Sequence, residues 1–499
     1  MRRRTVLKAF GWGIGGAVAL GGGFGAYYLG AKRDTVGKVA FDAALSIPAL
    51  ARSQRGASGA RVFTLGIQPG ETRFKAGRAT RTWGVNGTYL GPTIRARRGE
   101  PVEFVVHNGL DEETSLHWHG MHLPAVMDGG PHQTVAAGQS WTPRWTIDQP
   151  AATLWYHPHL HGSTAEHMYR GLAGLFIVDD EQVEPLNLPS EYGVDDVPMI
   201  VQDRAFDGDQ QFAQREPLAG SLGVIGDEIL VNGTIGPYFD VTTRLVRLRL
   251  LNGSPARLYH FGFSDDRRFS LIATDGGLLA APWQTDRLYL SPGERAEIVV
   301  AFEPGERVEL RSYPAAHGGV LGRLDGFDDR LDICQFRAAG SLSGDAAVPA
   351  VLGAAPDLAG EAVAQERSFV LASNQINGRS MAMDRIDFGV REGTVEVWEV
   401  TNDNGYLHNF HVHDVQFQVL TVDGGAPEPH LRGWKDTVLL VQGRRYRLAM
   451  RFRDHTDPNM PYMYHCHLLA HEDDGMMGQF VVLGAGEQVG VPPGQHRHP

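Results

Sequence analysis

Short segments in which polar and apolar residues alternate recur along the chain, and alternation of this kind predicts β-strands. Three such segments follow an Asn-Gly pair, which favours a tight turn between strands. The turns are Asn86-Gly87, Asn232-Gly233 and Asn377-Gly378, and the segments after them read EFVVHN, VRLRLLN and VEVWEVTN. Equivalent positions lie about 150 residues apart, a spacing that suits one β-sandwich per repeat.

A second set of alternating segments supports the same repeat. These segments adjoin Gly138, Gly293 and Gly443, and they read QSWTPRWTI, ERAEIVVAF and RRYRLAMRF. Helical periodicity is sparse, while the 62 glycines and 28 prolines supply many turn positions. The length of 499 residues allows about three domains. The sequence therefore predicts an all-β chain of three consecutive β-sandwich domains.

The repeats also predict the domain boundaries. A stretch rich in Ala, Gly, Ser and Pro separates the second repeat from the third, as expected for a linker. The predicted ranges are 45–182, 183–338 and 366–485 for the three domains, 339–365 for the linker and 486–499 for a flexible tail.

Four pairs of histidines, each separated by one residue, are the main chemical signal. The pairs are His117/His119, His157/His159, His411/His413 and His465/His467. Residues i and i+2 of a strand point to the same side, so each pair could bind one metal ion or two neighbouring ions. The last pair flanks Cys466, and His471 and Met476 follow it. A thiolate, imidazoles and a thioether are the ligands of a blue-copper site.

Ordinary surface chemistry and a zinc site are the alternatives to copper for these residues. A single His-x-His pair is more often a surface feature than a metal site, but four pairs in one chain are not. Zinc prefers closed tetrahedral sets of cysteine and histidine with short Cys-x-x-Cys spacings. This chain has only two cysteines, so copper fits the ligand types better than zinc.

With these four segments the chain resembles multicopper oxidases of the three-domain, bacterial laccase-like kind. That group includes copper-efflux cuprous oxidases, spore-coat laccases and bilirubin oxidases, and the likeness runs from about Arg61 to Leu483. The resemblance implies three cupredoxin-like Greek-key β-sandwiches and four copper ions per chain. It also implies dioxygen as the electron acceptor and, in most such proteins, a monomer.

The resemblance assigns every copper ligand of the family to a residue of this chain. It implies type 1 copper at His408, Cys466, His471 and Met476, type 2 copper at His117 and His411, and the type 3 pair at His119, His157, His159, His413, His465 and His467. Electrons would pass from type 1 copper through Cys466 to the other three ions.

Protons must also reach the cluster where dioxygen is reduced. The resemblance implies a proton-relay role for Asp128, and Glu472 is a second candidate. The alternatives are an ordinary turn aspartate and a glutamate that only hydrogen-bonds a ligand. The middle repeat has no His-x-His pair, so the three-copper cluster should lie between the first and third domains. The middle domain is expected to be a spacer, or else to shape the substrate entrance.

The amino terminus resembles a twin-arginine export signal. Arg3-Arg4 precede an apolar, Gly-rich stretch, and the signal is expected over residues 1–35. The protein is then periplasmic, extracellular or, if the segment is retained, membrane-anchored on the outer side. The alternative is a cytoplasmic protein with a chance basic start. The net charge of -12, without a basic patch, argues against a nucleic-acid partner, and Cys334 is expected to be a buried small hydrophobe.

The reducing substrate is expected to be a phenol or an aromatic amine. Cuprous oxidases of the family carry a methionine-rich insert, whereas here only Met381, Met383, Met460 and Met463 gather locally. Copper-efflux relatives have an acidic residue four positions before the type 1 histidine, where this chain has Asn404.

Three alternative functions remain. A metallo-oxidase of Cu(I), Fe(II) or Mn(II) is supported by the acidic residues Glu472, Asp473 and Asp474. Some relatives have lost copper and serve as scaffolds in the cell envelope, but here no ligand position is substituted. A copper nitrite reductase shares cupredoxin domains but lacks the cluster of four histidine pairs.

Overall fold

The computed structural model describes residues 31–213, 222–317, 322–344, 347–493 and 496–497. The predicted export signal therefore lies outside the described residues, apart from residues 31–35. Within the described ranges, no helix combines the length and apolar character needed to cross a membrane.

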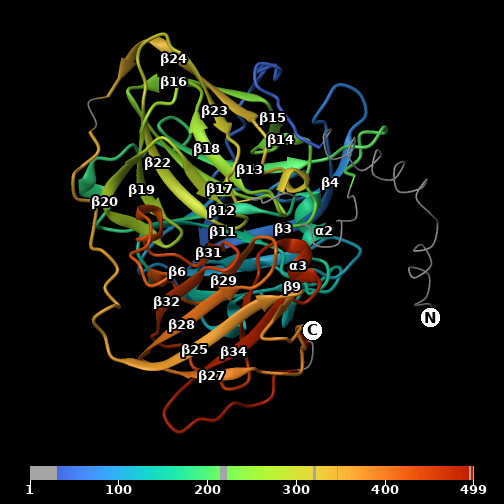
Figure 1. Cartoon of the computed structure of the whole chain (residues 1–499). Coiled ribbons are helices and arrows are strands. Elements are labelled where there is room, and N and C mark those ends of the chain that lie inside the picture. Colours follow the sequence, from blue (N-terminus) through green and yellow to red (C-terminus); the bar gives the residue numbers. More distant parts are fainter. Residues whose placement is uncertain (1–30, 214–221, 318–321, 345–346, 494–495, 498–499) are drawn as a thin grey trace, which may run out of the picture.

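The described chain is all-β, as predicted, and forms three consecutive cupredoxin-like Greek-key β-sandwiches. In Figure 1 the second domain (green to yellow) lies above the first (blue to cyan), and the third (orange to red) lies below. The described helices are α2 (Thr164–Arg170), α3 (Leu469–Asp473) and the short 3₁₀ turns η1 (Ala125–Met127), η2 (Glu184–Leu186), η3 (Gly322–Asp325) and η4 (Pro429–Leu431).

The first domain packs the sheet β10-β6-β3-β2, extended by β4 and β9, against the sheet β5-β12-β11-β7. Its strands are β2 (Ser53–Arg55), β3 (Arg61–Thr72), β4 (Thr80–Val85), β5 (Ile94–Arg97), β6 (Pro101–Asn108), β7 (His117–His119), β8 (Gln133–Thr134), β9 (Ser140–Trp141), β10 (Arg144–Thr146), β11 (Ala152–His157) and β12 (Gly174–Asp179).

The second domain packs the sheet β15-β14-β13-β17-β22-β19-β20 against the sheet β1-β16-β24-β23-β18-β21. Its strands are β1 (Ala43–Ala44), β13 (Asp196–Arg204), β14 (Glu228–Val231), β15 (Thr234–Ile235), β16 (Pro237–Thr243), β17 (Leu245–Asn252), β18 (Tyr259–Phe263), β19 (Phe269–Thr274), β20 (Gly277–Thr285), β21 (Leu288–Leu290), β22 (Arg295–Ala301), β23 (Arg307–Ser312) and β24 (Leu331–Ser343).

The third domain packs the sheet β26-β25-β28-β32-β30 against the sheet β27-β34-β33-β29-β31. Its strands are β25 (Val363–Ala372), β26 (Gln375–Ile376), β27 (Phe388–Arg391), β28 (Thr394–Asn402), β29 (His408–Val412), β30 (Phe417–Val422), β31 (Thr437–Leu440), β32 (Arg445–Phe452), β33 (Tyr462–His465) and β34 (Met477–Leu483).

The repeated segments of the sequence are partners in the same sheet of each domain. Strands β6, β17 and β28 contain the first set of segments, and β10, β22 and β32 contain the second. Each first-set strand pairs antiparallel with the second-set strand of its own domain and parallel with β3, β13 or β25. The sequence repeat therefore corresponds to one recurring supersecondary unit.

Three details differ from the predicted boundaries. Strand β1 pairs with β16 and Leu45 lies in the core of the second domain, so the chain contacts that domain before it enters the first. Strand β24 runs to Ser343 and β25 starts at Val363, so both extend into the predicted linker. Strand β35 (His496–Arg497), in the predicted tail, pairs with β8 of the first domain. Strand pairing, which the Gly-rich and polar compositions do not reveal, explains all three.

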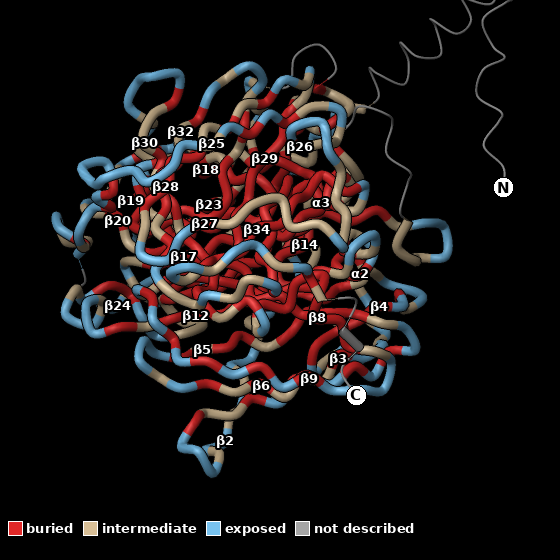
Figure 2. Tube along the Cα trace, turned by 90° about the horizontal axis from the view of Figure 1, so that it is seen from below, coloured by how far each residue is buried: buried red, intermediate tan, exposed pale blue. Residues whose placement is uncertain are grey.

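Each sandwich has its own apolar core, and buried residues also lie between neighbouring domains (Figure 2). Helices α2 and α3 contact each other between the first and third domains. There the carboxylate of Asp473 accepts backbone hydrogen bonds from Thr164 and Ala165, both at 2.9 Å. Such contacts fix the interface at which the histidine pairs meet.

Candidate metal centre

Strand periodicity separates the histidines of the third domain into two directions. On β29, Phe410 and Val412 point into the core of the sandwich, on the same side as His408. His411 points the other way, toward the first domain. Around β33 the same alternation directs Cys466 into the core and His465 toward the first domain. One strand therefore serves two separate sites.

Strand register brings the histidine pairs together. His117 on β7 lies opposite His157 on β11, and His411 on β29 lies opposite His465 on β33. Trp118, between the first two histidines, packs into the core of the first sandwich, so both neighbours point away from that core. The two sheet edges face each other, and eight histidines meet between them. We call His117, His119, His157, His159, His411, His413, His465 and His467 the histidine cluster.

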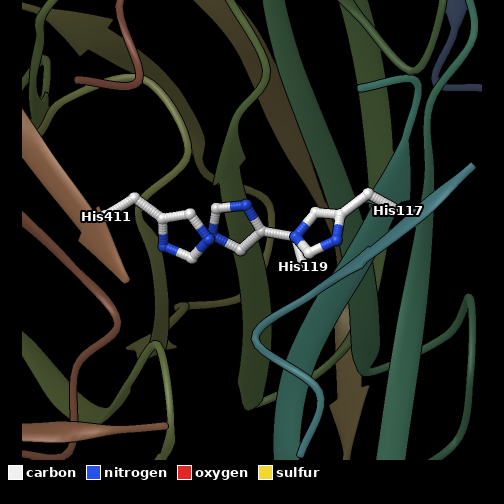
Figure 3. A group of neighbouring side chains, drawn as sticks. All are labelled: His117, His119 and His411. Atoms are coloured by element: carbon white, nitrogen blue, oxygen red, sulfur yellow. The ribbon is translucent and has the colours of Figure 1, made fainter. Parts of the chain in front are cut away.

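The ligand atoms of the histidine cluster fall into groups that are compact enough to hold metal ions, with all atoms of a group within 4.8 Å of one another. Three of the four His-x-His pairs are divided between two groups, as expected for neighbouring ions, whereas His117 and His119 share one group. Figure 3 shows one group, in which the rings of His119 and His411 are stacked with their centroids 3.8 Å apart and the ring of His117 completes the group. The groups are His117/His119/His411, His119/His157/His467 and His159/His413/His465.

Several nitrogens of the histidine cluster are buried without a hydrogen-bond partner. They include Nε2 of His117, Nε2 of His411 and both ring nitrogens of His467. A buried polar atom without a partner is costly, and in native proteins it usually has a ligand, a water or an ion. Nδ1 of His117 lies 2.9 Å from the carbonyl oxygen of Asp128, and Nδ1 of His411 lies 2.8 Å from that of Asp436. These bonds orient both rings and leave Nε2 available as a ligand.

Burial keeps six rings of the histidine cluster neutral. Desolvation lowers the pKa of His159 to about 3 and that of His467 to about 4. Desolvation is also the main reason why the pKa values of four further members fall well below 6.5, and repulsion among the rings lowers them further. These are His119, His157, His411 and His413. Neutral imidazoles have the free lone pair that metal binding requires.

A second group lies inside the third domain. Nδ1 of His408 is 3.4 Å from Sγ of Cys466, Nδ1 of His471 is 3.7 Å from it, and the two nitrogens are 3.2 Å apart. Met476 is fully buried, and its backbone bonds to those of Cys466 and His471. We call His408, Cys466, His471 and Met476 the cysteine cluster. Burial raises the pKa of the Cys466 thiol to about 12, so a metal ion would have to displace its proton.

The two clusters are joined through one peptide segment. His465 and His467, the neighbours of Cys466, belong to two different groups of the histidine cluster. The amide of His467 donates a 2.6 Å hydrogen bond to Oδ1 of Asn409, which also accepts from the Cys466 thiol, at 3.6 Å. An electron leaving the cysteine cluster has a covalent path to either neighbouring group.

The structure brings both candidate relay carboxylates to the histidine cluster. Oδ2 of Asp128 lies 2.7 Å from Nδ1 of His413. The oxygens of Glu472 lie 3.4 and 3.3 Å from Nδ1 of His159 and His465. Both side chains are almost completely buried. Burial alone would raise the pKa of Glu472, but the neighbouring imidazoles bring it well below its ordinary value.

Two further residues at the histidine cluster were missed by the sequence reasoning. Asp436 accepts at Oδ1 from Nε2 of His119 over 3.1 Å, and its carbonyl oxygen is the partner of His411. Arg295, from the second domain, contacts both carboxylate oxygens of Asp436. The only local signal was a charged pair, Lys435-Asp436, before the apolar run of β31. Cys334 is a buried residue of the second-domain core, far in the fold from both clusters.

Comparison with known proteins identifies the family. The multicopper oxidase profiles match residues 66–183 and 356–485. The chain is 35% identical over 444 residues to the multicopper oxidase mco of Staphylococcus haemolyticus, covering 87% of this chain and 91% of that protein. This chain belongs to the multicopper oxidase family.

Other relatives of this multicopper oxidase differ in their assigned roles. It is 36% identical over 450 residues to the cell division protein FtsP of Xenorhabdus nematophila, covering 89% and 93% of the two chains. It also superposes on the laccase-like multi-copper oxidase CueO of Ochrobactrum sp. with a TM-score of 0.80 and 38% identity, over 88% of this chain and 100% of that one. The family implies copper binding and oxidoreductase chemistry, and the buried imidazoles without partners fit copper.

Proposed function

We propose that this protein is a laccase-like oxidase that takes single electrons from phenols or aromatic amines and reduces dioxygen to water. The cysteine cluster would hold type 1 copper, and buried Met476 would offer it a thioether. His117 and His411 would hold type 2 copper. His119, His157 and His467 would hold one type 3 ion, and His159, His413 and His465 the other, which gives four ions per chain.

The observation that carries this proposal is the junction at Cys466. Its thiol belongs to one compact ligand group, and its two chain neighbours belong to two others. Bound copper would supply one-electron redox chemistry at the first group and the four-electron reduction of dioxygen at the rest. Oxidation of four phenol molecules and uptake of four protons then yields two waters. Asp128 and Glu472 lie close enough to the histidines to deliver those protons.

The surroundings of His408 favour an organic reductant. Nδ2 of Asn404 lies 2.5 Å from Nε2 of His408, so a neutral amide meets the outer edge of this ligand. The ring of Tyr406 lies 5.1 Å from that of His408 and supplies a surface on which a phenol can stack. The related Ochrobactrum enzyme is described with activity towards lignin model compounds.

The acidic residues that support a metallo-oxidase are mostly engaged elsewhere. Glu472 contacts the histidine cluster, and the carboxylate of Asp473 accepts a hydrogen bond from the backbone at the start of α2. Asp474 is exposed, but it contacts Asn374 rather than the His408 edge. A metallo-oxidase of Cu(I), Fe(II) or Mn(II) is therefore the second candidate.

Similarity to FtsP supports a third candidate, a structural role in cell division. The complete set of buried copper ligands argues against a copper-free version of that role. The amino-terminal sequence supports export by the twin-arginine route. The protein would then act in the periplasm, outside the cell or on the outer side of a membrane. As in most proteins of this kind, it would be a monomer.

The deciding experiment compares oxygen uptake by the copper-loaded full chain with a methoxyphenol and with Cu(I). Cys466→Ser is the inactive control, and Cys334→Ala is the matched control, because Cys334 is equally buried but lies in the second-domain core. Phenol-driven uptake that is lost only in Cys466→Ser supports the laccase-like function. Uptake with Cu(I) alone supports the metallo-oxidase, and a copper-loaded protein inactive with both supports the structural role.

A further inference from the structure

The second domain contributes no histidine to either cluster, yet one of its turns reaches the histidine cluster. This turn, residues 291–294, connects β21 to β22, which begins at Arg295. Asn409, which bonds the backbone of His467, donates its own amide to the carbonyl of Pro292 over 2.8 Å. A Cβ on Gly293 would lie only 3.1 Å from the ring of His467, and Gly293 has φ +84°. The turn is therefore packed directly against the cluster.

Arg295 has all its donors engaged. Nη1 and Nη2 contact Oδ1 and Oδ2 of Asp436 at 2.7 and 2.5 Å. The remaining N–H groups reach the carbonyl oxygens of Thr153 at 3.0 Å, Gly293 at 2.9 Å and Asp275 at 3.1 Å. Five donors meet five acceptors, and both side chains of the ion pair are fully buried. A planar, two-pronged contact of this kind fixes the orientation of a carboxylate.

Asp436, which lies in the third domain, passes this orientation on to ligand rings of two domains. Its Oδ1 accepts from Nε2 of His119 in the first domain, and its carbonyl accepts from Nδ1 of His411 in the third. Space around it is restricted, because a Cβ on Gly120 would come within 2.5 Å of Oδ2. Through Arg295, the second domain therefore fixes the position of Asp436, and Asp436 contacts one ligand ring of the first domain and one of the third.

A second buried ion pair strengthens the attachment of Asp436. Its neighbour Lys435 contacts Asp275 at 2.9 Å and Glu294 at 3.0 Å, both from the second domain. Oδ1 of Asp275 also accepts the backbone N–H of Arg295 over 2.8 Å. Charges of opposite sign alternate through this network, so none is left buried without a partner.

We propose that Arg295 is a positioning residue of the histidine cluster, which holds Asp436 so that His119 and His411 present their ligand nitrogens correctly. This inference rests on the proposed copper function. Its consequence is that the second domain sets copper affinity at two ligand rings, that of His411 in the type 2 site and that of His119 in the type 3 site, although it supplies none of the ligands. Outer contacts of this kind typically change metal affinity about 10- to 100-fold when they are removed.

The test is copper titration of the full-length Arg295→Lys variant. Lysine keeps the positive charge but lacks the planar guanidinium group that contacts both carboxylate oxygens of Asp436. Arg257→Lys is the matched control. Arg257 is a fully buried arginine of the same domain, bonded to Asp203 at 3.0 Å and Asp329 at 2.7 Å. The readouts are copper per chain, the type 2 signal in electron paramagnetic resonance and the blue absorption of the cysteine cluster.

We expect Arg295→Lys to weaken type 2 occupancy about 10- to 100-fold while the blue absorption is retained, and Arg257→Lys to change neither. Equal loss of both signals, or an unchanged type 2 signal, overturns the inference. If Arg295→Lys does not fold, Arg295→Gln with Asp436→Asn removes both charges together, and the same selective loss is expected. A parent protein that binds no copper overturns the proposed function instead.

Discussion

Nδ1 of His413 lies 2.7 Å from Oδ2 of Asp128, across the interface between the third and first domains. The backbone carbonyl of the same aspartate is the partner of His117. One residue of the 3₁₀ turn region after β7 therefore touches two groups of the histidine cluster with two different oxygen atoms.

Substituting Asp128→Asn tests whether this carboxylate delivers protons. Asparagine keeps a side-chain oxygen for His413 and leaves the carbonyl for His117 unchanged, so copper content should be retained. Loss of a general acid typically costs about 10²- to 10⁴-fold in rate, and we expect oxygen uptake with a phenol to fall within that range. Asp148→Asn, at an exposed aspartate of the same domain, should have no effect. Loss of copper in proportion to activity would contradict the relay role.

The repeat and the histidine pairs could be predicted because their signals are local. A period of two along β29 is sufficient to send His408 and His411 to opposite sides, and the sequence contains that period directly. The ligand-free middle repeat correctly indicated that the histidine cluster lies between the outer domains.

Contacts between distant segments could not be predicted in the same way. Arg295 and Asp436 are 141 positions apart, and no periodicity connects them. Glu472 was a relay candidate from the sequence, but its contact with His159 of the first domain depends on how α3 packs against that domain. Such contacts depend on how domains pack, which one chain's pattern of residue types does not encode locally.

The axial position of the cysteine cluster is tested by Met476→Leu. Leucine fills a similar volume, so stability should change by less than about 1.5 kcal/mol. Loss of the thioether should raise the reduction potential of type 1 copper, measured by redox titration of the blue absorption. Met477→Leu is the matched control, because Met477 lines a different pocket, beside Arg367 and Tyr464. An unchanged or lower potential in Met476→Leu would exclude this methionine as the axial ligand.

A charged contact between the first and third domains makes stability depend on pH. His122 lies 2.7 Å from both Asp414 and Asp454. Burial alone would lower the pKa of His122, but the two carboxylates raise it to about 10. Because the folded pKa exceeds the unfolded value of 6.5, the contribution is complete below pH 6.5 and is lost as the pH rises toward 10.

The corresponding variant is His122→Gln. Asp454 is about half exposed, so solvent screens part of the contact, and we expect a loss on the order of 2 kcal/mol in unfolding free energy at pH 6. The difference from the parent should shrink between pH 6.5 and 10 when denaturant unfolding is followed at several pH values. His107→Gln, at an exposed histidine, is the control. A difference that is constant with pH would contradict the ionic origin of the effect.

Charge at the outer edge of His408 should control the choice of reductant. Asn404 presents its amide to Nε2 of His408 at 2.5 Å, while its oxygen accepts the backbone N–H of Ser373 at 3.0 Å. Asn404→Asp keeps the shape and the bond to Ser373 but adds a negative charge where a reductant approaches. A single partly exposed charge contributes up to about 1 kcal/mol, so KM for Cu(I) should fall about two- to fivefold.

The same variant should leave KM for a neutral methoxyphenol unchanged, because a neutral reductant gains nothing from the added charge. Asp403→Asn is the control, because it removes a negative charge from the neighbouring, exposed position. This variant should change neither KM. Steady-state oxygen uptake with both reductants, repeated at higher salt, separates the cases, since a charge effect weakens as ionic strength rises. Equal changes in KM for Cu(I) and for the phenol would mean that position 404 acts through the geometry of His408 and not through charge.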